Sequence, residues 1–297
     1  MSAIEALVNG GGVKSPYLLP EGNVQIAFSG GRTSAYMLHH ILEANGCLPD
    51  RARVVFANTG REMPETLDFV QEVGSRWGVP ITWVEYRPDG AMFEVVSHNL
   101  ASRNGEPFEA MCIKRHGVPN QFVRFCTIEL KISTAKRYLM TLGWSEWTAA
   151  TGIRADEPKR FVSPTDKRKD RWFVWQPLVA AGVTKRDVTE FWAHQPFDLQ
   201  LPNVNGRTQL GNCDGCFLKS EAARAALARD FPDRFDWWVR LEEKMSRVRT
   251  DLGKSGPATF IAHQSYKQTA EFVRRQGDWL FSTEGALCQA DEGECIA

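Results

Sequence analysis

A serine- and glycine-rich segment directly after an apolar run has the composition of an anion-binding loop. Its residues are Ser29, Gly30, Gly31, Arg32, Thr33 and Ser34. Glycines let the backbone approach an anion closely, and the start of the following helix offers unpaired N–H groups at the positive end of its dipole. The hydroxyls and the guanidinium add further donors. We therefore predict that this loop binds phosphate, the alternative being an ordinary strand-to-helix turn that needs glycine.

Two arginines farther along the chain suit the same kind of ligand. Arg154 follows an apolar run at 147–152, and Arg160 comes shortly after it. Open α/β sheets bind ligands at the carboxyl ends of their strands, and guanidinium is the preferred planar partner of phosphate or sulfate. We expect both side chains to clamp an oxyanion. The alternative for each is a surface ion pair with Asp156 or Glu157.

Four of the seven cysteines form two pairs that could ligate one metal site. These are Cys112, Cys126, Cys213 and Cys216. The spacing Cys-x-x-Cys lets one turn offer two thiolates, but alone it leaves zinc, an iron–sulfur centre and a redox dithiol open. Buried cysteines that merely fill the core are the fourth alternative, to which we assign Cys47. Lys131 follows Cys126 closely and could bridge the cysteines and a substrate oxyanion, unless it is a solvated lysine.

The elements that must position these residues alternate between strands and helices. Apolar runs at 24–28, 53–57 and 81–86 are typical of buried strands. Helical patterns lie between them, at 34–44 and from Pro64 onward. This alternation predicts an open parallel α/β sheet with helices on both faces.

The remaining segments complete the predicted architecture. We expect an irregular insertion at 99–126, a helix at 133–142, strands at 147–152 and 173–179, a loop at 206–216, helices from 221 to about 249 and a last helix at 266–276. The predicted domains are an irregular lead-in at 1–22, an α/β domain at 23–220 and a helical C-terminal extension at 221–297.

The overall composition restricts the class of protein. Lys+Arg and Asp+Glu are equal at 36 each, so net charge indicates neither nucleic acid nor membrane, and any such binding must come from a local patch. No apolar run approaches the roughly 18 to 20 residues of a membrane helix. The first residues also lack the order of a signal peptide. We expect a cytoplasmic protein with reduced thiols, in which metal or redox chemistry explains the cysteines better than disulfides do.

The ordered motifs resemble those of a known superfamily. The loop at 29–34 is similar to the Ser-Gly-Gly-x-Asp-Ser signature of the PP-loop ATP pyrophosphatases and to the matching loop of their phosphoadenosine phosphosulfate (PAPS) reductase family. Further blocks match in the same order: Asn58-Thr59-Gly60 with Pro64-Glu65-Thr66, Gly152-Ile153-Arg154 with Arg160, Pro177-Leu178 with Thr184 and Asp187-Val188, and Gly211 to Cys216. Thr33 stands where ATP-cleaving members carry aspartate, and Asn58 replaces a family acid. Any Mg²⁺ binding at Thr33 must therefore depart from the family pattern.

The resemblance implies the adenine nucleotide alpha hydrolase-like fold, a nucleotide site and a cofactor. ATP, PAPS or adenylylsulfate (APS) would bind the loop together with Asn58, Thr59 and Gly60. The cysteine segments look like those that carry a 4Fe–4S cluster in APS reductases, with zinc as the lesser alternative. Those reductases have adjacent cysteines in the first pair. Here Phe125 precedes Cys126, so Cys112 would replace the missing ligand, as in viral and prophage members of the family.

Three functions follow from these observations. The first is ATP-dependent adenylylation coupled to sulfur transfer onto a nucleobase or nucleic acid, with a separate sulfur donor protein. The second is a sulfonucleotide reductase that acts on PAPS or APS. Such reductases carry a Glu-Cys-Gly-x-His tail, and here only Glu294-Cys295 matches, with Cys288 as a second candidate thiol. The third is a noncatalytic, metal-stapled nucleotide-binding module. The Gly30-Gly31 pair favours the first.

Overall fold

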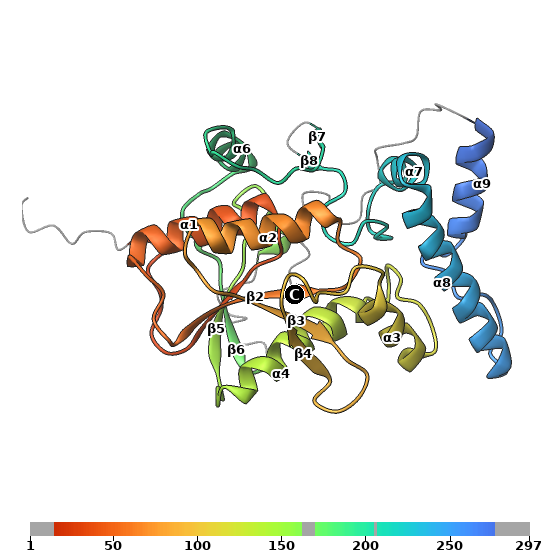
Figure 1. The fold of residues 1–297 in the computed structure, drawn as a ribbon, viewed down its shortest axis with the longest axis horizontal. Coiled ribbons are helices and arrows are strands. Elements are labelled where there is room, and N and C mark those ends of the chain that lie inside the picture. The colour runs from red at the N-terminus through yellow and green to blue at the C-terminus, as the bar shows by residue number, and fades with distance from the viewer. Residues whose placement is uncertain (1–14, 162–169, 205–206, 277–297) are drawn as a thin grey trace, which may run out of the picture.

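A six-stranded sheet in the order β4-β3-β2-β1-β5-β6 lies at the centre of the protein (Figure 1). The computed structural model describes residues 15–161, 170–204 and 207–276. The strands are β1 (Val24–Ala27), β2 (Ala52–Asn58), β3 (Ile81–Tyr86), β4 (Phe93–Val96), β5 (Trp147–Ala150) and β6 (Trp172–Trp175). All pair in parallel except β4, which runs antiparallel to β3.

The chain builds the sheet outward from β1 in two directions. It first adds β2 and β3 on one side and later β5 and β6 on the other. The strand order therefore reverses between β1 and β5, and a crevice opens at this point beyond the carboxyl ends of the strands. The loop that follows β1 and the arginine that follows β5 meet at this crevice.

Helices cover both faces of the sheet, as the sequence predicts. They are α1 (Arg32–Asn45), α2 (Pro64–Arg76), α3 (Glu106–Arg115), the π-helix η2 (Thr127–Ser133), α4 (Thr134–Thr141), the 3₁₀ turn η3 (Pro158–Arg160), α5 (Pro177–Ala180), α6 (Lys185–Ala193), α7 (Glu221–Asp230), α8 (Pro232–Asp251) and α9 (Tyr266–Gln276). In Figure 1, α1 and α2 lie above the strands and α4 lies below them. A short hairpin, β7 (Asn203–Val204) and β8 (Arg207–Thr208), lies near α6.

A cavity lies on one face of the sheet. On the face toward α1 and α2, Ile26 and Phe56 are fully buried in the main core. The opposite face carries the small Ala27 and Ala149 beside the stacked Trp147 and Trp172, because successive residues of a strand point to opposite sides. These small side chains leave a cavity between the sheet and the segment formed by η2 and α4.

Two predicted segments are wrong. The stretch at 99–126 is not wholly irregular, because α3 forms within it and carries Cys112. Its buried residues Pro107, Phe108, Met111 and Cys112 share one helical face, a spacing that the sequence analysis overlooked. The strand expected at 173–179 ends at Trp175, since the proline at 177 opens α5 instead.

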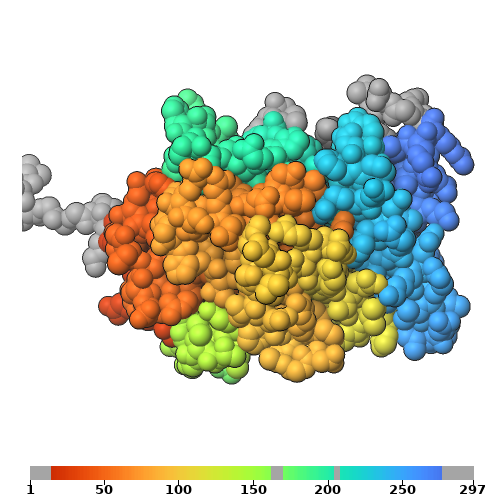
Figure 2. Space-filling view, viewed as in Figure 1, coloured from red at the N-terminus to blue at the C-terminus, as the bar shows by residue number. Residues whose placement is uncertain are grey.

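The C-terminal helices pack on the α/β body around one buried carboxylate. Figure 2 shows α7 to α9, in blue, against the yellow segment around α3. Asp214 accepts hydrogen bonds from Arg61 Nη2 at 2.8 Å, Arg234 Nε at 2.5 Å and Trp238 Nε1 at 2.7 Å. A Cβ on Gly215 would lie 2.4 Å from the Trp238 indole nitrogen, so only glycine permits this approach. One side chain therefore joins the loop after β2, the Cys-x-x-Cys turn and α8.

We predict that Asp214→Ala lowers the free energy of unfolding by about 3–5 kcal/mol, because it leaves the buried Arg61 guanidinium without its carboxylate. Urea unfolding followed by tryptophan fluorescence measures the change. Asp230→Ala is the matched control, since Asp230 forms a surface pair with Arg229, and it should stay within about 0.5 kcal/mol. Equal losses in the two variants would contradict the central role of Asp214.

Candidate functional site

The loop after β1 is shaped for close approach of an anion. Gly30 has a φ of 79°, and a Cβ there would lie 2.9 Å from Thr66 Cγ2, so glycine is required. The Oγ atoms of Ser29 and Ser34 lie 2.9 Å apart, and Ser34 Oγ donates to the Gly31 carbonyl, which closes the loop. The N-cap residue of α1 is Gly31, which has no side chain that could cap the first turn. The N–H groups of this turn thus face the position where an anion would bind.

The position of Arg32 in the loop suggests that its guanidinium binds the anion, but in the structure it forms an ion pair within the protein. Its guanidinium makes a bidentate pair with Asp198, with both N–O distances at 2.7 Å, and also donates to Thr208 Oγ1. Because Asp198 neutralises its charge, the side chain ties the start of α1 to the segment before β8. The sequence could not reveal this, since the partner lies far along the chain.

Arg154 reaches the phosphate loop from the end of β5. The side chain is only 3% exposed, and its Nη1 lies 3.4 Å from Thr33 Oγ1. Its Nε donates to Asp156, so one of the predicted alternative ion pairs is also present. The structure thus brings a guanidinium to the loop position where ATP-cleaving relatives carry an aspartate.

Arg160 is held on Glu157 rather than on the loop itself. Its Nη1 donates to Glu157 Oε1 at 2.5 Å, which is the ion pair that the sequence left open. Glu157 Oε2 accepts the backbone N–H of Arg154 at 3.0 Å. The buried carboxylate of Glu157 therefore supports both arginines, and Arg154 is the one whose side chain contacts the loop.

In the segment at the end of β2, one residue supports the fold and the next faces the candidate site. The amide nitrogen of Asn58 donates to Glu85 Oε1 at 2.6 Å, and its oxygen accepts the N–H of Gly60 at 3.1 Å. Asn58 is fully buried, so its side chain holds the strand end in place. Thr59 instead faces the cysteines, with its Oγ1 at 3.2 Å from Cys213 Sγ.

Two cavities meet at Lys131. The first lies against the face of the sheet that carries Ala27 and Ala149, and it reaches Ser29 and Thr151 at the ends of β1 and β5. The second is lined by Cys126, Cys213 and Cys216 together with apolar side chains. Lys131 lines both cavities, and its Nζ lies 3.4 Å from Asn212 Oδ1. Lys131 therefore lies between the two cavities, and its bridging role stays a prediction.

All four predicted cysteines are free thiols, and three of them, Cys126, Cys213 and Cys216, line the second cavity. Cys112 on α3 is fully buried, and burial raises the pKa of its thiol well above the usual value, with the neighbouring Cys126 adding to the effect. Burial likewise raises the pKa of Cys213, while Lys131 acts against the rise. Cys47 is exposed and stands apart from this group, so the prediction that it fills the core is wrong.

Three further residues belong to the site, and the sequence analysis missed them. Burial raises the pKa of Glu62, while the positive charge of Lys131 acts to lower it, and the Glu62 carboxylate accepts a hydrogen bond from Thr59 Oγ1. Asn212 adopts a φ of 53° at the turn before Cys213. Lys219 donates to the carbonyls of Gln209 and Gly211 and so holds this turn. The only available signal was that they flank recognised motifs.

Fold and site together define an α/β protein with an anion-binding loop at the switch point of a mostly parallel sheet. Residues 23–197 match the family model of the phosphoadenosine phosphosulfate reductase domain. The chain therefore belongs to this family. None of the helices in the described ranges has the length and hydropathy that crossing a membrane requires.

The similar proteins include viral and archaeal ones. An uncharacterized nin region protein of Escherichia phage lambda is 34% identical over 204 residues, which are 66% of this chain and 66% of that protein. An uncharacterized protein of Methanocaldococcus jannaschii is 29% identical over 77% of this chain and 43% of its own length. The chain thus spans just under two thirds of the first and less than half of the second. A phosphoadenylyl-sulfate reductase from Candida auris aligns with a TM-score of 0.38 and 18% identity over 64% of this chain and 81% of that structure.

We predict that Gly31→Val abolishes binding of ATP and of PAPS, because a branched side chain at the N-cap of α1 blocks backbone approach to the anion. Isothermal titration calorimetry measures both affinities, and circular dichroism checks the fold. Gly117→Val is the matched control, since nothing lies within 4 Å of a Cβ there. Unchanged binding in Gly31→Val would mean that the loop is an ordinary turn.

Proposed function

We propose that this protein is an ATP-dependent enzyme that adenylylates an oxygen of a nucleobase or nucleic acid and then replaces that oxygen with sulfur. The convergence of the loop at 29–34, Arg154 and Lys131 at one edge of the sheet is the observation that carries the proposal. Membership of the PAPS reductase domain family supports nucleotide binding at this edge.

The proposed reaction assigns a role to each part of the site. The acceptor oxygen attacks the α-phosphorus of ATP, and the bond to the leaving pyrophosphate breaks. Backbone N–H groups of the loop and the Arg154 guanidinium stabilise the negative charge on the departing group. Sulfide from the donor protein then attacks the carbon that bears the adenylylated oxygen, the carbon–oxygen bond breaks, and AMP leaves with that oxygen. Lys131, which lines both cavities, is placed to hold the AMP phosphate while this exchange occurs.

The cysteine cavity fits a thiolate-bound cofactor. Cys112, Cys126, Cys213 and Cys216 would hold it, and a buried thiol with a raised pKa would give up its proton on binding a metal. A tetrahedral zinc ion needs sulfurs about 3.8 Å apart. Within the described residues, no three of these sulfurs come within 4.8 Å of one another. We propose a 4Fe–4S cluster as this cofactor, which would supply a thiophilic metal centre for the sulfur to be transferred.

One observation favours a sulfonucleotide reductase as the second candidate. Arg154 contacts Thr33 where ATP-cleaving relatives carry an acid, so the loop could hold the anion of PAPS or APS without Mg²⁺. Such a reductase needs a nucleophilic thiol within reach of the bound substrate. The candidates Cys288 and Cys295 lie outside the described residues.

We predict that the protein, purified without oxygen, is brown, with the broad visible absorbance of a thiolate-bound iron–sulfur centre. Serine in place of any one of Cys112, Cys126, Cys213 or Cys216 should remove or strongly reduce this absorbance. Cys47→Ser is the matched control and should keep it, because Cys47 is exposed and away from the cavity. Colourless protein that contains one equivalent of zinc would contradict the cluster.

We predict that Arg154→Ala slows ATP-dependent release of pyrophosphate by a factor of about 10²–10³, or about 2.7–4 kcal/mol, as for loss of one oxyanion donor. Arg160→Ala should cost less, since Arg160 acts through Glu157. Removal of residues 286–297 should leave this turnover nearly intact. Release of sulfite from PAPS or APS that depends on Cys295 would instead establish the reductase.

A further inference from the structure

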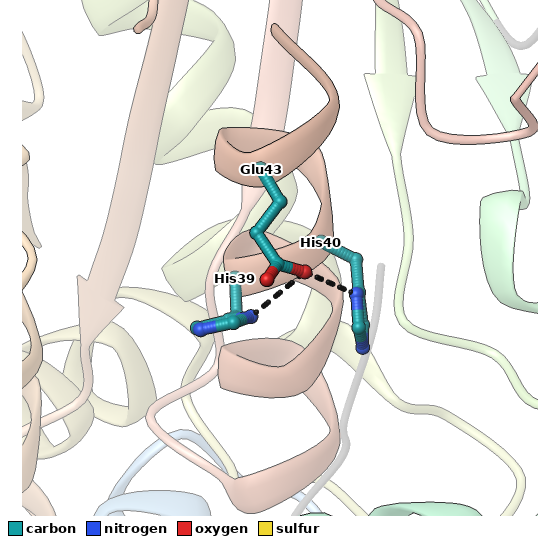
Figure 3. A group of neighbouring side chains, drawn as sticks. All are labelled: His39, His40 and Glu43. Carbon is teal, nitrogen blue, oxygen red and sulfur yellow. Dashed lines mark ion pairs between the residues drawn. The ribbon is translucent and has the colours of Figure 1, made fainter. Parts of the chain in front are cut away.

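Two histidines and a glutamate converge on the outer side of α1. His40 Nδ1 lies 2.8 Å and His39 Nδ1 lies 3.4 Å from the same oxygen, Glu43 Oε2. Figure 3 shows the two rings on either side of the carboxylate. Among the described side chains, these three make up the one group of His, Cys, Asp or Glu residues whose ligand atoms all lie within 4.8 Å of one another.

The distances suit a small tetrahedral metal ion. Zinc binds imidazole nitrogen at about 2.0–2.1 Å and carboxylate oxygen at about 2.0–2.2 Å, so ligand atoms in a tetrahedral site stand about 3.4 Å apart. The nitrogen–oxygen distances given above, 2.8 and 3.4 Å, need only a small adjustment to reach this geometry. Two imidazoles and one carboxylate leave a fourth position for water, as in other three-ligand zinc sites.

Aromatic neighbours fix the orientation of both imidazole rings. Phe191 on α6 contacts both, with ring centroids 4.9 Å from His39 and 5.9 Å from His40. Trp77 packs edge-on against His39 at 5.1 Å, and Tyr36 packs against His40 at 4.4 Å. Rings that are held in this way lose little rotamer freedom when they bind a ligand.

A polar atom in this cluster has no hydrogen bond. His39 Nδ1 is buried and lacks a hydrogen-bond partner in the described part of the chain, although it faces Glu43. A buried polar atom without a partner is costly, and a metal at this position would satisfy it.

We propose that His39 Nδ1, His40 Nδ1 and Glu43 form a Zn²⁺ site that is separate from the cysteine cavity and the phosphate loop. The Glu43 side chain is 58% exposed, which leaves the fourth position open to solvent. His39 lies seven residues after the start of α1, so the site is about 10 Å from the loop along the helix axis. Zinc at this position would link two successive turns of α1, the helix that begins at the phosphate loop.

Long-range ¹H–¹⁵N spectra of the histidine rings in the full chain, titrated with zinc chloride, test this site. The chain has six histidines, so each ring can be followed separately. Zinc should convert His39 and His40 to the form with a metal on Nδ1 and a proton on Nε2, while the other four rings keep their resonances. The readout is independent of zinc that the cysteines also bind.

Variants separate the proposed site from chance binding. Glu43→Gln, His39→Gln and His40→Gln should each weaken the response of the remaining rings at least tenfold. Glu72→Gln is the matched control, because Glu72 is also a helix glutamate in a surface pair, with Arg76, and it should leave the response unchanged. The proposal is overturned if excess zinc leaves the His39 and His40 resonances unshifted, or if Glu43→Gln responds like the wild type.

Discussion

The buried carboxylate of Asp214 is the interaction on which the geometry of the site depends. It has no exposed surface in its side chain, and a buried charge is tolerated only when several donors compensate it. Those donors come from the loop after β2 and from α8, namely Arg61, Arg234 and Trp238. The cysteine turn therefore takes its place only when both of these segments are in place.

The C-terminal helices consequently help to build the cysteine cavity. Trp238 lines the cysteine cavity, and the Tyr266 hydroxyl donates to the Gly215 carbonyl at 2.8 Å. Glu242 holds this arrangement by accepting the backbone N–H groups of Phe260 and Tyr266. Burial raises the pKa of Glu242 to about 7. A division of the chain near residue 220 thus describes the secondary structure but not the construction of the cavity.

Local sequence patterns predicted most helices and strands of the fold. The side-chain contacts that could not be predicted join residues that lie far apart in the chain. The alternation of strands and helices and the glycine loop were readable because each depends on neighbours in the chain. The antiparallel β4 was missed because it has only four residues, and α3 was missed because the helical spacing of its buried residues was overlooked. The engagement of Arg32 by Asp198 joins residues 166 positions apart. No spacing rule anticipates such a pair, and the same holds for the contact between Arg154 and Thr33.

That contact also bears on one departure from the family pattern, the threonine at position 33. An arginine 3.4 Å from an aspartate at position 33 would form an ion pair and lose much of its attraction for a phosphate. With threonine there, Arg154 pairs with Asp156, whose carboxylate is 36% exposed and hence partly screened by water, and it also lies 3.9 Å from the buried carboxylate of Glu157. A threonine at position 33 thus adds no further carboxylate beside Arg154, which is the arrangement that the proposed binding of an anion at this loop with less need for a bridging metal ion would require.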